Sequence, residues 1–105
     1  MAFADTLKTL PSVAHLAALE LVDAATGATV ARIENKPGQA GSLAVFNHLA
    51  ETFGAITPEA AKRGLEIYGE HTADARAHPG KHPNIDRLIA VIATGLALTV
   101  KPTPA

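Results

Sequence analysis

A histidine-rich corner between residues 70 and 86 holds the densest set of side chains that could do chemistry. Three of the five histidines lie there, together with two aspartates. Asp74 and His78 are four residues apart and share one face of a helix. His82 can fold back over them after Pro79-Gly80 ends that helix. Asp74, His78 and His82 are therefore the compact three-ligand set that local spacing allows, suited to a divalent metal such as zinc or to acid–base chemistry.

Two observations weaken the metal interpretation of this corner. Its spacing matches no strong zinc signature such as H-E-x-x-H. His71 and His78 are seven residues apart, which in an unbroken helix separates them by about 10.5 Å along the axis. A structural role is the alternative, because a histidine near a helix C-terminus interacts favourably with the helix dipole.

A second candidate site is the loop from Glu34 to Ser42. A strand, a glycine-bearing loop and a helix N-terminus follow one another there, which is a layout that can hold an anion. We predict ligand contacts from Lys36, Gly38, Gly41 and Ser42. The loop is not a P-loop, because Gly41 is followed by serine rather than by Lys-Ser or Lys-Thr. The alternative is a simple turn before a helix that Ser42 caps.

Residue periodicity predicts the elements that position these two segments. A short helix over 4–10 and a helical turn over 12–17 precede an antiparallel hairpin with strands at 18–23 and 28–34. Three helices follow: from Ser42 to a stop at Gly54, from 58 to 77 after Thr57-Pro58, and from 83 to 94. Alternation at 96–101 predicts a third strand, and 102–105 is expected to be a flexible tail.

The predicted fold is a single α+β domain over residues 1–105. A small three-stranded antiparallel-type sheet, the hairpin plus the C-terminal strand, is covered by three to four helices. We expect the third strand to pair with the hairpin and the helices to lie on one face of the sheet.

Composition excludes several classes of function. The chain contains no cysteine, which excludes disulfides and thiolate zinc sites. Nine basic and ten acidic residues give a net charge of −1, and the basic residues are scattered, so no nucleic-acid partner is expected. The longest strongly apolar stretch, 88–93, is far below the roughly 20 residues of a membrane helix, and no signal peptide is visible. These features predict a cytoplasmic protein that neither crosses nor binds a membrane.

Several segments together resemble a family of small, uncharacterised bacterial proteins of about 100 residues. They are Ile33-Glu34-Asn35-Lys36-Pro37-Gly38, Gly41-Ser42-Leu43-Ala44-Val45, Glu70-His71-Thr72 and the stretch from His78 to Leu88. The resemblance covers nearly the whole chain and implies a free-standing bacterial protein. It brings no activity and no catalytic residue with it.

The leading functional hypothesis is a non-enzymatic binding or interaction protein, as a homodimer or with another protein partner. It rests on the lack of a recognisable catalytic constellation and on the near-zero net charge. Two alternatives stay open. One is a small metal-dependent or acid–base enzyme at Asp74, His78 and His82, and the other is an anion or small-ligand binder at the loop from Lys36 to Ser42.

Overall fold

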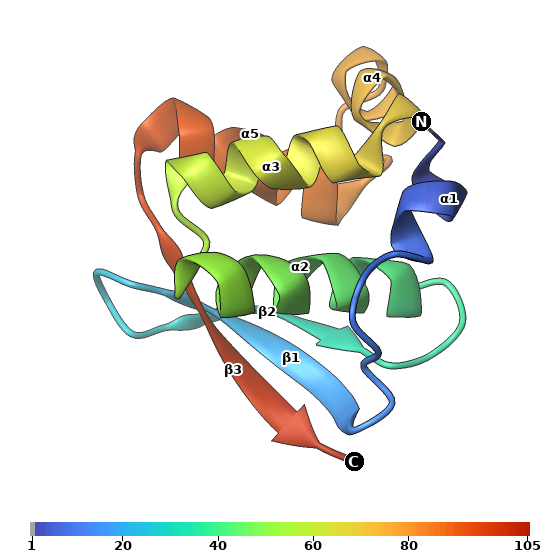
Figure 1. Cartoon of the computed structure of the whole chain (residues 1–105). Helices are drawn as coiled ribbons and strands as arrows, with labels where there is room; N and C mark the ends of the chain where they lie inside the picture. The colour runs from blue at the N-terminus through green and yellow to red at the C-terminus, as the bar shows by residue number, and fades with distance from the viewer. Residues whose placement is uncertain (1) are drawn as a thin grey trace.

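The computed structural model describes residues 2–105 and shows an α+β fold with a three-stranded antiparallel sheet (Figure 1). The strand order is β2-β1-β3, so the predicted hairpin and the predicted pairing of the third strand are confirmed. In chain order the elements are α1 (Phe3–Leu7), β1 (Leu16–Asp23), β2 (Thr29–Glu34), α2 (Ala40–Phe53), α3 (Pro58–Tyr68), α4 (Glu70–Ala77), α5 (Pro83–Thr94) and β3 (Leu98–Pro104).

The sheet presents one apolar and one polar face because side chains alternate along each strand. Leu19, Leu21 and Ile33 point to the buried face and are at most 2% exposed. On the other face, Glu20 of β1 lies opposite Arg32 of β2 and opposite Lys101 of β3. Cross-strand neighbours of opposite charge stabilise such a solvent-facing surface.

The helices lie on the apolar face in two layers, as Figure 1 shows. The longest helix, α2, packs directly on the sheet, and α3 and α5 lie over α2. Because α2 is covered from both sides, its buried residues extend around much of its circumference and include Val45, Phe46, Asn47 and Leu49. A helix in the middle of a layered fold loses the single apolar stripe of a surface helix.

Gly64 allows α3 to approach both α5 in the same layer and α2 in the layer beneath. A Cβ atom at this position would lie 2.7 Å from Leu88 Cδ1 of α5 and 2.9 Å from Leu49 Cδ1 of α2. Both leucines are fully buried, so neither has free space to move into. The absence of a side chain at Gly64 therefore permits the close packing of α3 on both α5 and α2.

The expectation of one helix over residues 58–77 is wrong. Thr57 caps the start as predicted, accepting a hydrogen bond from Ala60 N–H at 3.2 Å, with Pro58 in the first turn. The helix then stops at Tyr68 because Gly69 has φ 57° and ψ −120°. This conformation is open to glycine and strongly disfavoured for other residues. The chain turns there and continues as α4.

Three further expectations are corrected at element ends. Ser42 does not cap α2, because the helix begins at Ala40 and Gln39 is the residue before it. The third strand runs over Leu98–Pro104 rather than 96–101, so residues 102–104 pair with β1 and are not a tail. The first helix covers Phe3–Leu7 only, and β1 begins at Leu16, inside the expected helical turn. In contrast, Gly54 ends α2 and α5 spans 83–94 as predicted.

Candidate functional site

The two loops singled out in the sequence line one pocket of about 270 Å³. Gly38, Gly41 and Ser42 come from the first loop, and His82 comes from the histidine-rich corner. The remaining walls are Phe3 of α1, Tyr68 and His71 beside the α3–α4 bend, and the segment 81–85 that starts α5. In Figure 1 these elements gather at the end of the molecule where α1, α4 and the start of α2 lie.

The first turn of α2 offers backbone donors to this pocket. The side chain of Gln39 is turned away, since its Oε1 accepts from Glu34 N–H at 3.0 Å, and no side chain caps the helix. The N–H of Ala40 bonds to the Lys36 carbonyl at 2.9 Å. Within residues 2–105, the N–H groups of Gly41 and Ser42 find no acceptor. They are the orphan donors that every α-helix has at its N-terminus.

Among the described residues, the N-terminus of α5 also lacks a side-chain cap and has backbone N–H groups without an acceptor. His82 precedes the helix without capping it through its side chain, and Pro83 at the first position has no N–H to satisfy. The N–H groups of Asn84 and Ile85 have no acceptor in the described part of the chain, and both residues line the pocket. Two uncapped helix starts therefore face the same cavity, and each carries partial positive charge.

Ser42 is held by a buried tyrosine. Tyr68 Oη donates a hydrogen bond of 2.7 Å to Ser42 Oγ. Burial raises the pKa of Tyr68 to about 12, so its hydroxyl stays protonated. Because Ser42 Oγ accepts from Tyr68, the hydrogen of its own hydroxyl is available to another acceptor.

The charged wall of the pocket is organised around Asp74. Its Oδ2 lies 2.7 Å from His82 Nε2 and 2.9 Å from Lys81 Nζ. The hydrogen bond with His82, and then that with Lys81, lowers the pKa of Asp74 to about 2. Lys81 and His82 line the pocket and are anchored from behind by this carboxylate. Asp74 therefore fixes the two basic side chains that face the cavity.

A turn before α5 presents these basic residues. Gly80 N–H donates to Asp86 Oδ2 at 2.9 Å, and Lys81 N–H donates to the His78 carbonyl at 3.1 Å. Gly80 has φ 93°, which suits the bend after Pro79. The Pro-Gly break, which the sequence indicated as a helix end, thus also directs Lys81 and His82 toward the pocket.

The residues of the predicted metal set are brought together only in part. His82 contacts Asp74, whereas His78 Nε2 is 3.9 Å from Asp74 Oδ1, is largely exposed and does not line the pocket. Within residues 2–105, no group of three or more His, Asp and Glu side chains has an arrangement that could hold a metal ion.

Lys36 is the one residue of the predicted anion loop that is directed elsewhere. Its Nζ lies 2.6 Å from Glu34 Oε2, and this contact lowers the pKa of Glu34. The lysine that lines the pocket is Lys81. Sequence reasoning missed its role, and the available signal was its position between the Pro79-Gly80 break and the start of α5.

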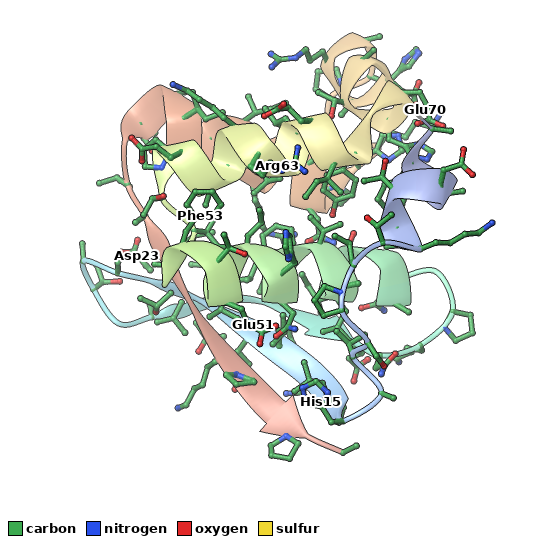
Figure 2. All side chains as sticks on the ribbon, viewed as in Figure 1. His15, Asp23, Glu51, Phe53, Arg63 and Glu70 are labelled. Atoms are coloured by element: carbon green, nitrogen blue, oxygen red, sulfur yellow. The ribbon has the colours of Figure 1, made fainter. Side chains whose placement is uncertain are left out.

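An aromatic wall closes the pocket on the side of α1. The Phe3 ring stacks on Tyr68 with centroids 5.2 Å apart and meets the edge of His71 at 5.3 Å. Phe3 N–H donates to Glu70 Oε1 at 2.8 Å, and this bond lowers the pKa of Glu70. Figure 2 shows Glu70 beside the start of α1. Phe3 and His71 were not identified from the sequence.

Asp74 is expected to make part of the stability depend on acidity. Its pKa is lowered from 3.8 to about 2 in the folded protein, so the folded state binds protons less readily than the unfolded chain. The stabilisation is present above the unfolded value and is lost as pH falls from 3.8 toward about 2. The melting temperature of Asp74→Asn should therefore fall less over this interval than that of wild type.

Thermal unfolding scans at the two ends of that interval measure the effect. Asp5→Asn, at an exposed aspartate of α1, is the matched control and should keep the wild-type dependence. Equal pH dependence in wild type and Asp74→Asn would contradict the assigned role of the contacts with Lys81 and His82.

None of the helices within residues 2–105 combines the length and apolar character that a bilayer crossing requires. No curated protein and no solved structure is significantly similar to the chain. One family model does match, over residues 3–102. Because the match covers almost all of the 105 residues, the chain belongs to the family described as "Uncharacterized protein conserved in bacteria (DUF2322)".

Proposed function

We propose that this protein is a non-enzymatic, cytoplasmic binding protein for a small anion, which it holds in the pocket between the starts of α2 and α5. One observation carries the proposal: Lys81, two histidines and two uncapped helix starts line the same cavity. Each of these groups favours negative charge.

The donors are complementary in kind. Gly41, Ser42, Asn84 and Ile85 offer backbone N–H groups, whose positions are fixed by the helices. Lys81 offers a full charge, and its ammonium keeps two hydrogens beyond the one directed at Asp74. Fixed donors select the shape of a ligand, while the lysine supplies attraction.

The size of the pocket limits the ligand. The pocket has a volume of about 270 Å³, which is room for several water molecules. This volume lies just below the range of about 300–1,000 Å³ that is typical of small-molecule sites. The pocket therefore suits a small organic or inorganic anion and not a dinucleotide cofactor.

Removing the positive charge of Lys81 is expected to weaken anion binding by roughly tenfold or more, the effect of losing one charge-assisted hydrogen bond. Inorganic phosphate, titrated at constant ionic strength, should raise the melting temperature of wild type, because a ligand of the folded state stabilises it. Lys81→Met should require correspondingly more phosphate for the same rise.

Lys62→Met is the matched control, since Lys62 is exposed on α3 and does not line the pocket. It should behave as wild type in the same titration. If phosphate raises the melting temperature no more than chloride does, or raises it equally in Lys81→Met, the proposed site is wrong.

A second candidate function, an acid–base enzyme, is favoured by the contact between Asp74 and His82. The carboxylate of Asp74, 2.7 Å from His82 Nε2, orients the imidazole ring. His82 also lines the pocket, so it could exchange a proton with a bound molecule. Mass spectrometry of a ligand recovered after incubation distinguishes the two functions, because a binding protein returns it unchanged.

A further inference from the structure

We infer that the ligand of this pocket is a small phosphate monoester with an apolar ester group, and that Phe3 selects for that group. The inference rests on the proposed anion site and adds the chemical class of the ligand. This ligand class is inferred from the number of hydrogen-bond donors in the pocket and from its aromatic and apolar lining residues.

The donors favour a phosphoryl group over a carboxylate. Three separate segments provide them: the first turn of α2, the first turn of α5 and Lys81. A phosphoryl group on an ester has three terminal oxygens and a charge between −1.5 and −2 at neutral pH. A carboxylate has two oxygens and one charge, so it leaves more of these donors without a partner.

The pocket also has apolar surface that offers little to a polar ligand, and part of it lies beside the first turn of α2. The rings of Phe3 and Tyr68 stack there, and the Tyr68 hydroxyl already bonds Ser42. Pro83 and Ile85 add apolar surface without a side-chain donor. Inorganic phosphate alone would fill only part of a pocket of 270 Å³ and would leave this wall in contact with water. An apolar ester group covers it.

Phe3 is the residue that makes this wall selective. It is the only residue of α1 that lines the pocket, and its ring packs beside Gly41, where a Cβ atom would lie 3.5 Å from the ring. Phe3 is only partly buried, so truncating it removes part of the wall at a smaller cost in stability than truncating a fully buried residue.

Isothermal titration calorimetry with three probes tests the inference: inorganic phosphate, phenyl phosphate and benzoate. Wild type should bind phenyl phosphate roughly tenfold or more tighter than inorganic phosphate, since burying one aromatic ring has at least this effect. It should also bind phenyl phosphate tighter than benzoate, because the phosphoryl group has one more oxygen and more negative charge than the carboxylate. Phe3→Ala should lower the affinity for phenyl phosphate more than the affinity for inorganic phosphate, so that the two affinities become similar. Leu7→Ala is the matched control: Leu7 also lies on α1 beside Gly41, but it does not line the pocket.

The outcomes separate this inference from the proposed function. Benzoate binding as tightly as phenyl phosphate would overturn the phosphoryl assignment while leaving an anion site. Equal affinities for inorganic and phenyl phosphate in wild type would overturn the apolar ester group, and this comparison needs no variant. Binding of none of the three probes would overturn the anion site itself.

Discussion

Replacing Phe46 with alanine is expected to lower the free energy of unfolding by about 3–5 kcal/mol. Phe46 is fully buried on α2, the helix that lies between the sheet and the upper helices. Neither layer can close the resulting cavity without moving α2. The total free energy of unfolding of such a domain is roughly 5–15 kcal/mol, so the variant should lose a large part of its stability. Denaturant titration measures the loss.

Phe53→Ala provides the matched control for this prediction. Phe53 lies on the same helix but is 39% exposed, and Figure 2 shows it at the end of α2 away from the pocket. Truncating Phe53 should lower the free energy of unfolding by about 1 kcal/mol or less, because little cavity forms at an exposed site. Similar losses in the two variants would mean that α2 is not packed between two layers.

Gly69→Ala is expected to lower the free energy of unfolding by about 1–3 kcal/mol and also to weaken anion binding. The native φ of 57° with ψ of −120° is strained for any residue with a Cβ. Relief of that strain rotates α4 relative to α3, and α4 carries both His71 and Asp74. The pocket would lose one wall and the anchor of Lys81. Denaturant titration gives the stability, and phosphate titration gives the binding.

Gly54→Ala separates these two effects. Gly54 also has a positive φ, 82°, and ends α2 far from the pocket. It should lose stability by a comparable amount and keep its affinity for phosphate. If Gly69→Ala binds phosphate as well as wild type does, α4 is not needed to shape the site.

Local pattern predicted most elements but not the bend at Gly69. The hairpin, the helix starts at Thr57 and Pro83 and the third strand follow from alternation, capping and proline position. Gly69 interrupts a stretch whose apolar spacing continues through Tyr68 and Thr72. A single glycine inside such a stretch is tolerated in helices, so its positive φ is decided by packing and is not visible in the sequence.

The site was predicted as two separate loops, and only the tertiary structure joins them. Local spacing relates Asp74 to His78, four residues on, and places Lys36 in the first loop. It cannot show that α2 and α5 begin side by side, which depends on the stacking of layers. Lys36 is instead engaged by Glu34, two residues before it on the same strand end. Lys81, whose acidic partner Asp74 is seven residues away in the sequence, was overlooked.

The strand order determines which strand pairings can form early during folding and which must form late. The central strand, β1, is made early, yet one of its two partners, β3, follows all five helices. Loop closure across this distance is slow compared with local helix and hairpin formation. During synthesis, β1 therefore has one unpaired edge until β3 emerges from the ribosome. That edge could pair with other nascent chains, so we expect the protein to depend on chaperones more than its size suggests.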